Sequence, residues 1–203
     1  MNSSTSLYDL LEGYWPTLYD GFSAVWTEGL DVAEVAERLG ADPATATVCT
    51  LKGIGRGFGD APPGDQAEVI LIGRHGDWVL TMQIQHMGVV SGRALSALSE
   101  NNGRAISVGW HINGAHRIAY AAQGAVIASQ NMRYIPEILQ RYADGLYIPD
   151  VDDVEDGDFP IEEMINTNLI LVGRVIGHEL NAEWLEREHV RYIIPAEEAE
   201  FSS

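Results

Sequence analysis

The chain has 203 residues, 46% of them hydrophobic, and its 30 acidic and 12 basic side chains give a formal net charge of −18. Such a surface cannot displace counterions from phosphate groups, so we expect no direct binding to nucleic acid or to an anionic membrane. The single cysteine, Cys49, excludes an intramolecular disulfide and a cysteine-based metal site, and no apolar run is long enough for an ordinary spanning helix.

The N-terminal residues Met1–Ser6 lack the basic and apolar regions of a secretory signal, so we expect a cytoplasmic location. The length suits one α+β domain over residues 1–203, and no internal repeat is visible. Within that domain we expect an acidic loop at residues 144–160 and a loose acidic tail at residues 196–203.

The N-terminal part of the chain predicts four elements. Leu7–Tyr19 favours a short helix followed by a turn, and Phe22–Thr27 fits either a strand or the end of a helix. Asp31–Leu39 is predicted to be a helix, because its first residue can act as N-cap with Glu34 three residues later. Thr47–Leu51 is predicted to be a strand.

The middle of the chain predicts two antiparallel hairpins. Glu68–Ile72 can pair with Trp78–Ile84, and Arg117–Ala122 can pair with Ala125–Gln130. Both pairs are joined by short loops that contain glycine, which is typical of antiparallel strands.

Between the hairpins, Ser91 is expected to cap a short helix that ends in a left-handed turn at Asn102-Gly103. Apolar residues then alternate with polar ones from Ile106 to Asn113, as in a strand with one buried face. The sequence therefore predicts a curved antiparallel sheet of about five to seven strands with helices packed on one face, and it leaves open which face is exposed.

The C-terminal part predicts further helices and an edge strand. Pro136–Ala143 reads as a short helix, and Pro160 begins a long helix that ends at Gly177. Asn181 can cap another short helix, and Val190–Ile194 is predicted to be an edge strand.

Several segments also carry a resemblance. Val25-Trp-Thr-Glu-Gly-Leu, Gly76-Asp-Trp-Val-Leu, Arg104-Ala-Ile-Ser-Val-Gly-Trp and Ala119-Tyr-Ala occur in an order that is similar to a family of uncharacterised (domain-of-unknown-function) proteins from high-GC Gram-positive bacteria. The resemblance spans roughly residues 20–190, and its tryptophans and glycines specify packing and turns. It supports the fold expectation and implies no activity for any residue.

The acidic residues are concentrated in one segment. Between Asp144 and Glu163 the sequence has nine acids and no base, which is half of the net charge. We therefore expect a non-enzymatic protein-binding module, of an inhibitor or immunity type, that docks this acidic surface or the exposed sheet face on a basic partner. The expected partner-binding residues are Asp150, Asp152, Asp153, Glu155, Asp156 and Asp158.

A calcium site in the same segment is one alternative. It arises when Gly157 is aligned with the invariant glycine of an EF-hand loop. The carboxylates that then fall at ligand positions are Asp152, Asp156, Asp158 and Glu163. Val154 occupies the third position of the loop and cannot bind a metal, so a solvated acidic loop is the simpler interpretation.

An enzyme or metal-binding protein that uses sheet-face histidines is the other alternative. His111 lies on the polar side of its predicted strand, and His116 follows a turn, so they could meet and be joined by His75 or His86. No carboxylate stands beside them at motif spacing, which favours ordinary surface histidines.

The glycine-rich stretch Gly53–Gly59 fits neither nucleotide-binding motif, so we expect a surface loop there and no cofactor. The sequence leaves the oligomeric state open.

Overall fold

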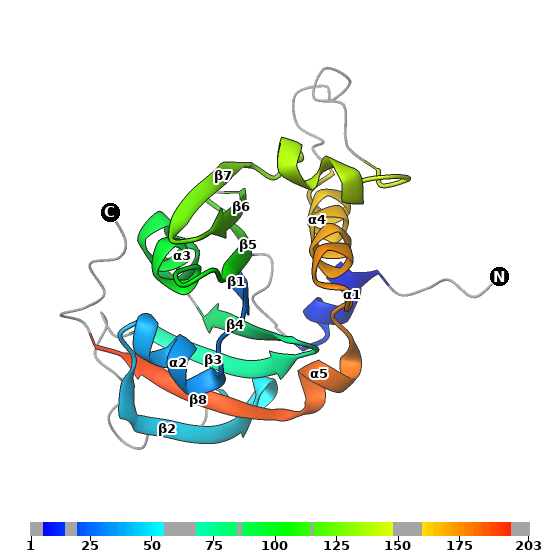
Figure 1. The fold of residues 1–203 in the computed structure, drawn as a ribbon. Coiled ribbons are helices and arrows are strands. Elements are labelled where there is room, and N and C mark those ends of the chain that lie inside the picture. Colours follow the sequence, from blue (N-terminus) through cyan, green and yellow to red (C-terminus); the bar gives the residue numbers. More distant parts are fainter. Residues whose placement is uncertain are drawn as a thin grey trace.

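The protein is an α+β fold built on a single open, antiparallel sheet of eight strands in the order β2-β8-β3-β4-β1-β5-β6-β7 (Figure 1). The computed structural model describes residues 6–14, 20–54, 68–84, 87–114, 116–147 and 160–195. In these residues no helix is both long enough and apolar enough to cross a membrane.

The strands are β1 (Gly21–Glu28), β2 (Asp42–Thr50), β3 (Glu68–His75), β4 (Trp78–Ile84), β5 (Arg104–His111), β6 (Arg117–Ala122), β7 (Ala125–Asn131) and β8 (Glu188–Ile194). The α-helices are α1 (Leu7–Glu12), α2 (Val32–Arg38), α3 (Gly92–Leu98), α4 (Ile161–Ile176) and α5 (Ala182–Glu186). The described residues also form three short 3-10 helices, namely η1 (Leu51–Gly53), η2 (Gly88–Val90) and η3 (Glu137–Tyr142).

The predicted count of five to seven strands was too low, and β1 explains why. This strand lies at the centre of the sheet between β4 and β5, and its six inner residues are all buried. A strand that is buried on both faces has no alternation of apolar and polar residues. The sequence pattern of this segment therefore could not distinguish a strand from a helix.

Both predicted hairpins are confirmed. β3 pairs antiparallel with β4, and β6 pairs antiparallel with β7. The second hairpin turns at Gln123 and Gly124, whose φ angles of 54° and 78° are those of a tight left-handed turn.

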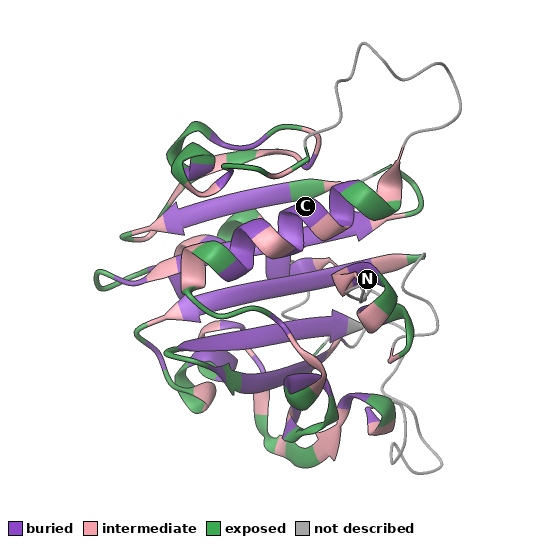
Figure 2. Cartoon of the chain, turned by 90° about the vertical axis from the view of Figure 1, so that its right-hand side faces the viewer, coloured by how far each residue is buried: buried purple, intermediate pink, exposed green. Residues whose placement is uncertain are grey.

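The helices cover both faces of the sheet, so the prediction of one covered face was wrong. α1, α4 and α5 pack on one face, while α2, α3 and η2 pack on the other (Figure 1). In Figure 2, α4 crosses in front of strands whose residues are mostly buried.

The polar sheet face is buried beneath α2 and α3. Thr81, Gln83 and Ser107 are at most 1% exposed. Gln83 donates a hydrogen bond to the carboxylate of Glu68, which is itself buried, and accepts one from the backbone N–H of Val89 at 2.8 Å. Because of these hydrogen bonds, the helices can cover this face without leaving the Gln83 amide or the Glu68 carboxylate unpaired.

The helix caps follow the sequence closely. Asp31 and Glu34 form the predicted capping box at the start of α2. Ser91 caps α3, and α4 ends at Gly177 in a left-handed conformation with φ of 75°. The segment predicted to be an edge strand is part of β8, but β8 lies between β2 and β3 and is therefore an inner strand.

Candidate functional site

The two candidate histidines lie at the same end of the sheet. His111 is the last residue of β5, and its Nδ1 accepts a hydrogen bond from the backbone N–H of Asn113 at 3.2 Å. His116 directly precedes β6, is half-buried, and has its pKa lowered by burial and by the charge of Arg133. Across the described ranges, no three His, Cys, Asp or Glu side chains lie close enough together to hold a metal ion.

His75 cannot join them, because it lies at the opposite end of the sheet. Along β1, Gly21 pairs with His111, whereas Glu28 pairs with Trp78, the residue opposite His75. Seven strand positions separate the two ends, a distance of about 23 Å. His86 lies outside the described residues.

His75 instead belongs to a buried cluster of rings beside α5. The indole N–H of Trp26 donates to His75 Nδ1 at 3.2 Å, and His75 Nε2 lies 3.3 Å from the carbonyl oxygen of Glu179. Because an indole N–H can only donate, Nδ1 must accept, and Nε2 must carry the ring proton and donate it to Glu179. This pattern requires the neutral form of the imidazole.

The same cluster contains two further histidines. The ring of His178 meets His75 edge to face at 4.8 Å, and His189 stacks on Trp184 at 3.9 Å. Burial and the charge of His178 lower the pKa of His75 to about 4. Burial also lowers the pKa of His189, whose Nε2 lies 2.7 Å from the carbonyl oxygen of Trp184. His75 and His189 are therefore buried structural groups between the sheet and α5, whereas His178 is exposed at the margin of the cluster.

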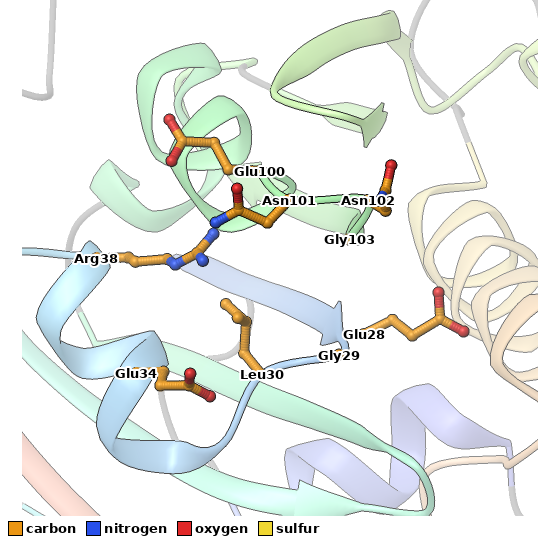
Figure 3. A pocket seen from close by; sticks show the side chains of 9 residues that line it. All are labelled: Glu28, Gly29, Leu30, Glu34, Arg38, Glu100, Asn101, Asn102 and Gly103. Carbon is orange, nitrogen blue, oxygen red and sulfur yellow. The ribbon is translucent and has the colours of Figure 1, made fainter.

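A surface cleft of about 370 Å³ lies between the end of β1, the helix α2 and the turn that follows α3 (Figure 3). Its lining residues are Glu28, Gly29, Leu30, Glu34, Arg38, Glu100, Asn101, Asn102 and Gly103. The left-handed turn predicted at Asn102-Gly103 is formed one residue earlier, since Asn101 and Asn102 have φ angles of 57° and 66°.

Most charged groups of the cleft already have partners. Glu28 forms a two-pronged ion pair with Arg104, which lowers the pKa of the Glu28 carboxyl, and in Figure 3 its side chain points away from the cleft. Glu34 accepts the backbone N–H of Asp31 at 2.7 Å, and Arg38 donates to the carbonyl oxygen of Ala97 at 2.8 Å. The cleft therefore presents polar groups around Leu30 and no nucleophile beside a base. Sequence reasoning missed it, although the adjacent asparagines after α3 were a signal for its turn.

Charge is distributed unevenly over the fold. Between Trp78 and Pro136 the sequence has four arginines and a single acid, Glu100. This range contains β5, β6 and β7, which form one end of the strand order, and α3, which covers them. Exposed acids are frequent elsewhere, namely Glu34 and Glu37 on α2, Glu162 and Glu163 on α4, and Glu179, Glu183, Glu186 and Glu188 around α5.

The predicted partner-binding residues Asp150, Asp152, Asp153, Glu155, Asp156 and Asp158 lie outside the described residues, as do residues 55–59 of the glycine-rich stretch and the tail from residue 196. Of the calcium candidates, only Glu163 is described, and it is exposed in the first turn of α4. The acidic docking surface and the calcium loop therefore stay predictions.

The fold and its surface define a class: an α+β protein with one sheet covered by helices on both faces and a strongly acidic, unevenly charged exterior. No protein-family model, no curated protein and no solved structure matches the chain. The resemblance to uncharacterised proteins of high-GC Gram-positive bacteria thus stays a prediction.

Proposed function

We propose that the protein is a non-enzymatic binding module that docks an acidic surface on a basic partner protein, in the manner of an inhibitor or immunity protein. One observation carries the proposal, namely the separation of charge over the fold. The sequence from Trp78 to Pro136 is nearly free of acids, whereas the rest of the chain carries an excess of 21 negative charges. A basic partner would therefore be attracted more strongly to the acid-rich segments than to the range from Trp78 to Pro136.

This separation would act mainly on the rate and orientation of encounter. Complementary potentials raise association rates by about 10- to 1000-fold and lose this effect as salt screens them. At an ionic strength of about 0.1 M, screening becomes strong beyond about 10 Å, so close carboxylates matter most. The segment between Asp144 and Glu163 has the densest run of such carboxylates in the sequence.

The described residues give less support to the alternative that the protein is an enzyme that uses sheet-face histidines. His75 is about 23 Å along the sheet from His111. Its hydrogen bonds to Trp26 and Glu179 occupy both ring nitrogens in a buried position. Cys49, the only cysteine, has its pKa raised by burial, which makes the thiol a poorer nucleophile.

The test is a comparison of two variants that remove the same charge from different places. The first changes Asp150, Asp152, Asp153, Asp156 and Asp158 to Asn. The control neutralises five exposed acids elsewhere, by changing Glu12, Glu37 and Glu137 to Gln and Asp20 and Asp77 to Asn. Each chain is immobilised and exposed to native cell extract at low and at moderate salt, and any retained protein is identified, purified and titrated against all three chains.

We expect the wild-type chain and the control to retain the same basic protein, with an affinity that falls as salt rises, and the first variant to lose it. Equal binding by all three chains would place the docking surface away from residues 150–158. Retention of no basic protein by any chain would refute the proposed function itself.

A further inference from the structure

The two edges of the sheet differ in how they are protected against pairing with another strand. On the β2 edge, Pro43 lacks an N–H and Asp42 brings a charge, and the pairing register with β8 shifts between Asp42 and Thr47. Edge strands commonly carry proline, charges and irregularities of this kind, because these features discourage the addition of a further strand. β2 is therefore a protected edge.

β7 lacks both the proline and the charge. Its sequence, Ala-Val-Ile-Ala-Ser-Gln-Asn, is uncharged, and β6 is its only strand neighbour among the described residues. The pairing with β6 skips Ile127, which is 52% exposed, and is regular from Ala128 to Asn131. Like β2, β7 has an irregularity in its pairing, but its regular part has no proline and no charge, and no further strand pairs with its outer side among the described residues.

Opposite charges stand at the two ends of β7. At the Gly124 end, the Gly124 N–H donates to the carbonyl oxygen of Ser99, and a Cβ added at Gly124 would lie 3.4 Å from Cγ of Glu100. At the other end, Arg117 is exposed and pairs with Asn131. Glu100 thus marks one end of the strand and Arg117 the other.

Both charged residues lie on the same face of the sheet. Arg117 shares its side of β6 with Ala119 and Ala121, which pack in the cluster under α2 and α3. Glu100 follows α3 in sequence and lies next to the turn between β6 and β7. A two-fold axis perpendicular to the sheet would keep both residues on that face.

We propose that two copies of the chain associate through β7, with the two β7 strands antiparallel and the sheet continuous across both copies. Antiparallel pairing brings the Gly124 end of one strand to the Asn131 end of the other, so Glu100 of each copy lies at the same end of the interface as Arg117 of its mate, and the symmetry repeats the arrangement. The occupant is a second copy because the edge is complementary to itself in charge. The β7 edge also lies in the range from Trp78 to Pro136, which has a single acidic residue, so electrostatic repulsion between two acidic chains is smallest there.

The test measures the mass of the full-length chain in solution over a wide range of concentration by sedimentation equilibrium. The disrupting variant is Ile127→Lys with Ser129→Lys, which places like charges across the two-fold axis at positions that are exposed in the single chain. Val48→Lys is the matched control, because Val48 is 61% exposed on the other edge strand. Circular dichroism and thermal unfolding establish that each variant is folded.

We expect the wild type and Val48→Lys to be dimers and the β7 variant to be a monomer. Glu100→Arg and Arg117→Glu should each raise the dissociation constant at least about tenfold, and combining them should restore it to nearly the wild-type value. A monomeric wild type at every concentration would overturn the proposal. The proposal would also be overturned if the β7 variant were still a dimer, or if the effects of the two charge reversals on the dissociation constant were simply additive.

Discussion

His75 provides a direct test of the buried ring cluster through the dependence of stability on pH. It is 2% exposed, its Nδ1 accepts from Trp26, and its pKa is lowered to about 4 from an ordinary value of 6.5. A proton on Nδ1 would place two N–H groups against each other inside the protein. The folded state therefore disfavours the imidazolium form, which the unfolded chain takes up freely.

The sign follows from linkage. The unfolded chain binds a proton at His75 below about pH 6.5 while the folded protein does not, so the free energy of unfolding falls as pH decreases towards the folded pKa. With these two pKa values, the loss from about pH 7 to about pH 5 is about 2 kcal/mol for this group. The pKa values of His116 and His189 are also lowered, so they add to the loss in the same direction.

The perturbation is His75→Gln, whose amide oxygen can still accept from Trp26 but whose side chain does not titrate. His111→Gln, at the other end of the sheet, is the control for removing a histidine. Urea unfolding followed by tryptophan fluorescence gives the free energy of unfolding across the pH range for the three chains. We expect His75→Gln to be less stable than wild type near pH 7 but to lose about 2 kcal/mol less on acidification. Equal losses in all three chains would refute the argument that His75 is held neutral by burial.

Three other substitutions test packing, capping and an ion pair. Gly73→Ala places a Cβ in the space of the His189 ring, and we expect it to cost about 1–3 kcal/mol in urea unfolding, and less in a His189→Ala background. Asp31→Ala removes the cap of α2 and should cost about 1 kcal/mol in thermal unfolding, whereas the Asn variant keeps most of that stability. Glu28→Gln breaks the half-exposed pair with Arg104 and should cost at most about 1 kcal/mol after screening. Because the pKa of Glu28 is lowered in the folded protein, the wild type should be more stable than the Gln variant above the ordinary pKa of 4.5. This difference in stability should disappear at lower pH, as acid unfolding can show.

Local signals in the sequence predicted much of the fold. The capping box at Asp31, the serine cap at Ser91 and the glycine-containing hairpin turns depend on neighbours within a few residues, so they could be read directly. The position of β8 could not, because the neighbours of a strand in a sheet are set by contacts between distant segments. The same limit hid the second covered face. Thr81 and Gln83 are polar, and only the tertiary structure shows that helices bury them.

The candidate site was less predictable than the fold, for a related reason. His75 and His111 both belong to strands with similar patterns, and sequence gives no register between strands that are not joined by a hairpin. The register across β1 places them at opposite ends of the sheet. Conversely, the ring contacts of His75 with His178 and Trp184 join segments about one hundred residues apart, and no spacing motif could have indicated them.

Together, the proposed β7 dimer and the proposed acidic docking surface predict how many partners one dimer binds. β7 and β2 are opposite edges of the sheet, so a dimer through β7 places the β2 edges of its two copies far apart. β5, β6 and β7, which contain no acidic residue, would then lie nearest the two-fold axis. Each copy would carry its own acidic segment, so we expect a dimer to bind two basic partners. The Ile127→Lys and Ser129→Lys variant keeps every carboxylate of residues 150–158, so it should still bind the basic partner while being a monomer.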